Sequence, residues 1–258
     1  MHLPVHDDPP DPHAQRMHDR RRVLRAFNAS LAFVLLLAAV FTAQKGFDAG
    51  AWAVTPHAVE GLIGLLTGPV LHGSFAHVTA NAVALLLLGT LAGSVYPRAT
   101  LRALPLLWLG SGLGAWLLGE PGTHHLGASG VTHGLMFLVF TLGLLRRDRP
   151  AIAAAMIAFF LYGGMLLTVL PQEPGVSWQS HLGGALAGLV AAWLFRRSDP
   201  LPPRKRYSWE LEEELAAEAA RAEREQFEPV SPRDVPVLWQ RPSEPTGVVL
   251  PFPPKRSD

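Results

Sequence analysis

The chain has 258 residues, of which 49% are hydrophobic and 17% are charged, whereas a soluble domain usually carries about 25% charged residues. This composition favours a membrane protein, and a net charge of +1 gives no strongly basic face that would indicate nucleic-acid binding. The absence of cysteine excludes disulfides, thiol nucleophiles and thiolate metal sites.

Six apolar segments approach the length of about 20 residues that a membrane-spanning helix needs. We therefore predict an all-α, polytopic six-helix membrane domain over residues 29–197, with its spans near 29–45, 73–95, 101–119, 129–145, 151–170 and 178–195. The polar residues 1–28 are expected to form a disordered cytoplasmic tail. Residues 198–258 are expected to form a second cytoplasmic tail, with a helix near 208–227 and a Pro-rich disordered end.

The distribution of basic residues predicts the orientation of these helices. Fifteen arginines and lysines lie before the first span, after the sixth, and in two of the connections, whereas the other three connections (46–72, 120–128 and 171–177) are preceded by a single one, Lys45. By the positive-inside rule, both termini are cytoplasmic and those three connections face outward.

Polar residues recur at one depth in three of the predicted spans. Asn81 lies 17 residues before Arg98, Ser129 lies 17 before Arg146, and His181 lies 15 before Arg196. At about 1.5 Å per residue, all three lie roughly 22–25 Å above the inner face, in a hydrocarbon core about 30 Å thick. Polar groups at such a depth are costly unless they are partnered or line a wet cavity.

The residue types in this layer point to serine hydrolysis. Ser129 is the candidate nucleophile, flanked by Gly127 and Gly130, and His181 is the candidate base, with Gly184 and Gly188 giving its helix a smooth face. His77 and Asn81 share a helix face and are candidate donors to an oxyanion. No HExxH run and no aspartate or glutamate lies in the predicted spans, so we predict neither a metal site nor an acid to orient His181. His124 and His125 are expected to be solvated.

Three motifs together resemble the rhomboid family of intramembrane serine proteases: His72-x4-His77-x3-Asn81, Gly127-x-Ser129-Gly130 and His181-x2-Gly184-x3-Gly188. The resemblance covers about residues 29–196. It implies a Ser129–His181 dyad, an oxyanion hole at His77 and Asn81, and a structural role for His72. Four residues after the serine, where some members carry an aromatic side chain packed on the catalytic histidine, this chain has His133. The pattern also resembles the rhombosortase branch.

The leading hypothesis is thus an endopeptidase, without cofactor, that cuts membrane-anchored proteins near the outer boundary of the lipid bilayer, in a bacterial inner membrane. The alternative is a catalytically inactive rhomboid-like scaffold that binds transmembrane helices, in which His77 and Asn81 would serve helix packing. A small transporter would instead need charged or paired polar residues at the midplane.

Overall fold

The computed structural model describes residues 12–171, 175–200 and 208–227, and these are largely helical. The chain divides into two compact units, residues 1–202 and 203–258. The second unit contains α8 (Ser208–Phe227), where the sequence predicted a helix. The predicted disorder at residues 228–258 and at the first eleven residues lies outside the described part of the chain.

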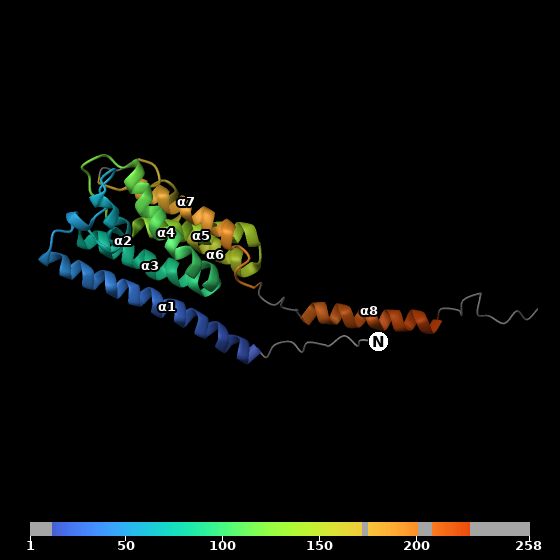
Figure 1. Ribbon diagram of the computed structural model, residues 1–258. Helices are drawn as coiled ribbons and strands as arrows, with labels where there is room; N and C mark the ends of the chain where they lie inside the picture. Colours follow the sequence, from blue (N-terminus) through green and yellow to red (C-terminus); the bar gives the residue numbers. More distant parts are fainter. Residues whose placement is uncertain (1–11, 172–174, 201–207, 228–258) are drawn as a thin grey trace, which may run out of the picture. The chain divides into compact units, whose positions relative to one another are not determined.

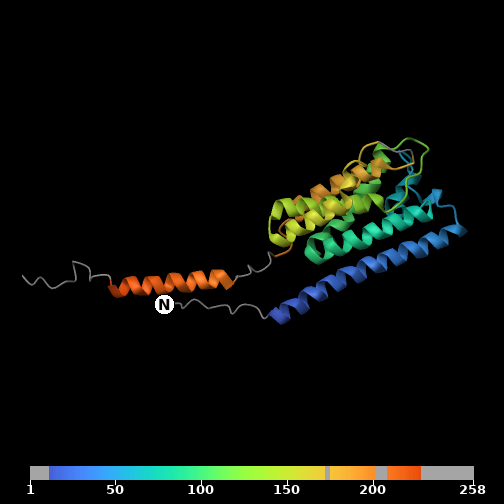
Figure 2. The same ribbon diagram turned by 180° about the vertical axis from the view of Figure 1, so that it is seen from behind.

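The described part of the first unit is a bundle of long helices, six by their printed bounds, and Figures 1 and 2 show how they lie side by side. They are α1 (Pro12–Ala43), α3 (Phe75–Val95), α4 (Pro97–Leu118), α5 (Ser129–Arg146), α6 (Arg149–Tyr162) and α7 (Trp178–Phe195). Between α1 and α3 the chain forms α2 (Gly64–Thr67) and four 3-10 turns, and a further 3-10 turn, Gly163–Leu166, extends α6. The strand-like pairing among the described residues is an isolated antiparallel bridge between Val54 and His125.

Among the described residues, five segments are long and apolar enough to cross a membrane: Arg16–Gly46, Phe75–Val95, Pro97–Leu118, Ser129–Arg146 and Arg149–Leu166. The prediction of an all-helical membrane bundle is therefore confirmed at this level. The sixth predicted span corresponds to α7, which has 18 residues and carries Gln179, Ser180 and His181 in its first turn. This helix is not among the five segments.

The start of the first helix differs from the sequence prediction, because α1 begins at Pro12 and not near Ala29. Residues 12–28 are helical, so the predicted disordered tail is wrong over this segment. This segment is held against α3 by side-chain contacts that a hydropathy profile does not reveal. Arg22 donates to the carbonyls of Ser94 and Val95 at the end of α3, at 2.6 and 3.3 Å, and Ala26 packs against Gly93.

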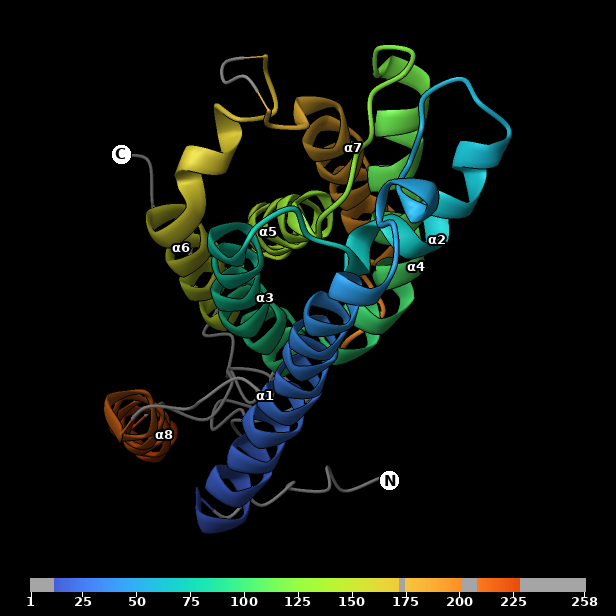
Figure 3. The ribbon, with the colours of Figure 1, turned by 90° about the vertical axis from the view of Figure 1, so that its left-hand side faces the viewer.

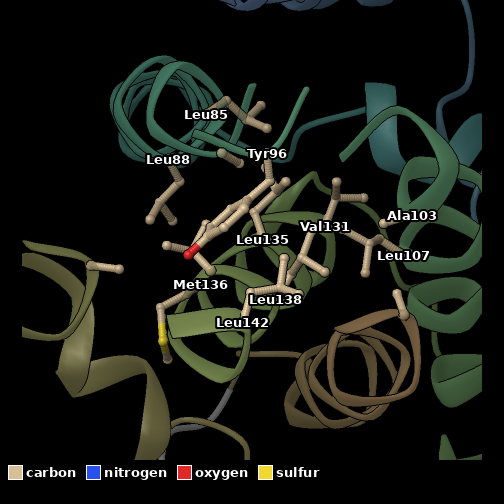
Figure 4. Close-up of a cluster of buried hydrophobic side chains, with 14 of the residues drawn as sticks. Leu85, Leu88, Tyr96, Ala103, Leu107, Val131, Leu135, Met136, Leu138 and Leu142 are labelled. Atoms are coloured by element: carbon tan, nitrogen blue, oxygen red, sulfur yellow. The ribbon is translucent and has the colours of Figure 1, made fainter. Parts of the chain in front are cut away.

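Helix α5 lies at the centre of the bundle, between α3, α4, α6 and α7 (Figure 3). Its buried side chains pack with those of α3 and α4 in one apolar core, which includes Leu88, Leu107, Leu135 and Leu138 (Figure 4). Helix α5 is therefore held in the bundle by apolar packing along its length.

Candidate active site

The structure brings Ser129 and His181 into hydrogen-bonding contact. Ser129 is the first residue of α5 and His181 lies in the first turn of α7. The Ser129 Oγ lies 2.9 Å from the His181 Nε2, and the His181 side chain is buried. This is the distance at which a serine hydroxyl can pass its proton to an imidazole.

Close backbone contact between α5 and α7 sets this distance. A Cβ added at Gly184 would lie 1.9 Å from the Gly130 carbonyl oxygen, and one added at Gly188 would lie 2.4 Å from that of Gly134. Real Cβ atoms do not approach so closely, so the two helices touch through their backbones at both points. The glycines predicted to give α7 a smooth face thus bring His181 within reach of Ser129.

The turn before α5 depends on Gly127, which has a φ of +119°. An L side chain rarely adopts this conformation, and a Cβ there would lie 2.5 Å from the His77 Cε1. The Gly127 amide donates to the carbonyl of Gly68 at 2.9 Å. These constraints place Ser129 at the helix start, where the first backbone N–H groups have no partner within the helix.

His77 and Asn81 lie on α3, whose first turn is capped by the Ser74 side chain. The His77 ring borders Gly127, and Asn81 is buried at 5% exposure. The Asn81 Nδ2 has no hydrogen-bond partner in the described structure. An unpaired buried amide donor is costly to a fold.

His72 links three parts of the site. Its backbone exchanges hydrogen bonds with the side chain of Gln44, and its Nε2 accepts from the Ala128 amide at 3.4 Å. Its ring also lies edge-on to that of His77, with centroids 5.1 Å apart. Burial, and to a smaller extent the nearby His77, lower the pKa of His72 from 6.5 to about 4, with the Val70 backbone opposing the shift. These contacts fit the structural role expected of His72.

His133 stacks on His181, with ring centroids 3.8 Å apart and an interplanar angle of 11°. It also contacts two other groups: its Nδ1 lies 2.6 Å from the Ser129 carbonyl oxygen, and its Nε2 lies 2.8 Å from the Thr168 Oγ1. The Thr168 carbonyl oxygen in turn lies 2.9 Å from the His181 Nδ1. Sequence reasoning missed Thr168, which belongs to no motif and follows the apolar run Met165–Leu167.

A second polar cluster joins the loop before α5 to the start of α7. The His125 Nδ1 lies 2.6 Å from the Ser177 Oγ, and its Nε2 lies 2.9 Å from the Thr123 Oγ1. Ser177 caps α7. Burial, and secondarily the neighbouring His124, lower the pKa of His125. The expectation that His125 is solvated is thus wrong, because the bridge to Val54 and the contact with Ser177 draw it into the fold.

In the described part of the chain, no group of three or more histidine, aspartate or glutamate side chains is arranged to hold a metal ion.

Residues 59–198 match the Rhomboid domain, and the match covers more than half of the chain. The chain belongs to the rhomboid family. Uncharacterized proteins of Mycobacterium bovis and Mycobacterium tuberculosis are 39% identical to it over 149 residues, which is 55% of this chain and 62% of theirs. An uncharacterized protein of Mycobacterium leprae is 38% identical over 141 residues, 52% of this chain and 56% of its own. The rhomboid chain thus matches less than two thirds of the length of these relatives.

Proposed function

We propose that this rhomboid is an intramembrane serine endopeptidase that cleaves membrane-anchored proteins near the outer boundary of the bilayer through a Ser129–His181 dyad. The observation that carries the proposal is the 2.9 Å contact between the Ser129 Oγ and the His181 Nε2. Membership of a family that includes serine proteases supports it.

In the proposed reaction, the Ser129 oxygen attacks the carbonyl carbon of the scissile peptide bond and its proton passes to the His181 Nε2. The carbonyl π electrons move to the oxygen, and the proposed donors to this oxyanion are the Asn81 amide, the His77 ring and the first backbone N–H groups of α5. His181 then gives its proton to the leaving amine as the C–N bond breaks. A water molecule repeats these steps on the acyl–enzyme and restores Ser129.

The proposal includes six membrane crossings with cytoplasmic termini, in a bacterial inner membrane. The basic residues cluster beyond the C-terminal end of α5 and α7, opposite to the end that carries the dyad. The substrate bond must therefore be presented from the outer side. A helical substrate hides its peptide bonds, so small or helix-breaking residues are expected near the cut. Residues 1–28, of which those from Pro12 onward belong to α1, and residues 198–258 have no part in the proposed reaction.

The test compares wild type with Ser129→Ala and with Ser94→Ala, in which the removed hydroxyl bonds the backbone of α3 near its other end. Each purified protein is given a model transmembrane substrate and a fluorophosphonate probe, which acylates activated serines. We expect wild type and Ser94→Ala to cleave and to label, and Ser129→Ala to lose at least about four orders of magnitude in rate. Failure of folded wild type to label would favour the inactive scaffold.

A further inference from the structure

A closed ring of hydrogen bonds joins Ser129 and Thr168 to the two stacked imidazoles, those of His133 and His181. Ser129 contacts the His181 Nε2 through its Oγ and the His133 Nδ1 through its carbonyl oxygen, at 2.9 and 2.6 Å. Thr168 mirrors this arrangement, with its carbonyl oxygen 2.9 Å from the His181 Nδ1 and its Oγ1 2.8 Å from the His133 Nε2. Each imidazole is thus held at both nitrogens by the same two residues.

The ring determines where the protons lie. A carbonyl oxygen only accepts hydrogen bonds, so the His181 Nδ1 carries a hydrogen and donates it to Thr168. In neutral His181 the lone pair is then on Nε2, facing the hydroxyl of Ser129. By the same argument the His133 Nδ1 carries a hydrogen and donates it to the Ser129 carbonyl. The His133 Nε2 is left as an acceptor for the Thr168 hydroxyl.

Helices α3, α5 and α7 contain no aspartate or glutamate that could hold His181 in this form. Thr168 occupies the place of such an acid beside His181 and carries no charge. It lies in the connection between α6 and α7, directly after the 3-10 turn Gly163–Leu166, and this brings one backbone carbonyl and one hydroxyl to the two rings. The Thr168 Oγ1 also lies 3.2 Å from the Met165 carbonyl oxygen, but the nitrogen of His133 is nearer.

We propose that Thr168 is a positioning residue for the hydrolysis: its carbonyl holds His181 in the tautomer that can accept the Ser129 proton, and its hydroxyl holds His133 neutral and stacked. This inference rests on the proposed function. His181 becomes a cation during each proton transfer, and a second cation stacked 3.8 Å away would oppose that step. A hydroxyl that donates to the His133 Nε2 occupies the site where such a proton would bind.

The experiment uses the full chain and measures kcat and KM on the model substrate for Thr168→Val, which keeps the β-branched shape and removes the hydroxyl. Thr168→Ser restores the hydroxyl, and Thr90→Val is the matched control, because the Thr90 hydroxyl bonds its own helix backbone in α3. We expect kcat of Thr168→Val to fall about 10- to 100-fold, with KM within about twofold. Thr168→Ser should stay within about threefold of wild type.

The route through His133 is tested in a His133→Phe background, which keeps a stacked ring and removes both nitrogens. There, Thr168→Val should change kcat less than about twofold, because the hydroxyl no longer has a ring nitrogen to hold. An equal loss in both backgrounds, or no loss in Thr168→Val, overturns the proposal, as does failure of Thr168→Ser to restore kcat. If wild type itself neither labels nor cleaves, the proposed function has failed instead.

Discussion

At the scale of single residues, the unpaired Asn81 amide destabilises the fold, and a function in catalysis would explain why it is there. It is buried, and its Nδ2 donates to no group in the described structure. An unsatisfied buried donor destabilises a protein by about 1–3 kcal/mol. A developing oxyanion at Ser129 would supply the missing acceptor, so the energy of this hydrogen bond would be gained in the transition state alone.

Replacing Asn81 by alanine should therefore separate activity from stability. We expect kcat to fall by about 10²-fold, the usual effect of losing one oxyanion donor, while Tm in detergent stays the same or rises. The measurement pairs steady-state cleavage with thermal unfolding. If Tm falls together with kcat, Asn81 serves packing and not the oxyanion.

His72 makes stability depend on pH. Its folded-state pKa of about 4 lies below the ordinary value of 6.5, so between these values the unfolded chain binds a proton that the folded chain does not. Stability is complete above pH 6.5 and is lost as the pH falls through this window, by about 2 kcal/mol at pH 5. The lowered pKa of His125 acts in the same direction.

The matched variant is His72→Gln, whose side-chain oxygen can still accept from the Ala128 amide but does not titrate. We expect a lower Tm than wild type at pH 7.5 and a smaller loss of Tm between pH 7.5 and 5. The remaining pH dependence should include that of His125. Identical pH dependence in the two proteins would show that His72 does not carry the effect.

The dyad was predictable from sequence because it depends on two regular quantities, the rise of a helix and the position of the basic residues at its end. These two quantities put Ser129 and His181 in one layer. Thr168 and the His125–Ser177 contact were not predictable in this way. They lie in irregular connections, where no periodicity relates a residue to its height or direction.

At the scale of elements, the site depends on how closely α5 and α7 approach. The contact at Gly184 is backbone against backbone, with the Gly130 carbonyl oxygen 1.9 Å from an added Cβ. A backbone group cannot rotate away as a flexible side chain can, so any larger residue must separate the helices. The distance from Ser129 to His181 would increase with that separation.

We therefore expect Gly184→Ala to destabilise the bundle by at least about 1–3 kcal/mol, the usual effect of overpacking, and to abolish fluorophosphonate labelling of Ser129. The matched control is Gly46→Ala, since an added Cβ there meets nothing within 4 Å and should change neither Tm nor labelling. Normal labelling of Gly184→Ala would mean that the helix contact does not set the dyad distance.

The helices themselves were predictable to within a few residues wherever hydropathy changes at their ends, as at α3 and α7. The start of α1 was not, because residues 12–28 are polar and their helix is held by specific partners. Arg22 binds the carbonyls that end α3, a contact between residues more than seventy positions apart. Neither the composition of the sequence nor its hydrophobic periodicity indicates such a pairing.

At the scale of the whole membrane unit, the two ends of α5 have different tasks. The helix begins at Ser129 and finishes at Arg146. The Arg146 side chain donates to the carbonyls of Asp199 and Pro200 and pairs with Asp148. Asp199 in turn accepts from the Arg98 and Ala99 amides at the start of α4, at 3.0 and 2.9 Å. The end away from the dyad is thus tied together by charge-assisted bonds.

Whether α7 crosses the membrane decides whether the two ends of the bundle lie on opposite sides of the bilayer. Three helices, α5, α6 and α7, lie between Glu120 and Arg197. If all three cross, these two exposed positions face opposite sides; if the polar start of α7 keeps it from crossing, they face the same side.

The native chain has no cysteine, so single cysteines can be introduced without background. In intact cells, a membrane-impermeant maleimide should label Glu120→Cys and should reach Arg197→Cys only after the membrane is opened. Equal labelling of both in intact cells would rule out six crossings, and with them the delivery of substrate to His181 from the outer side.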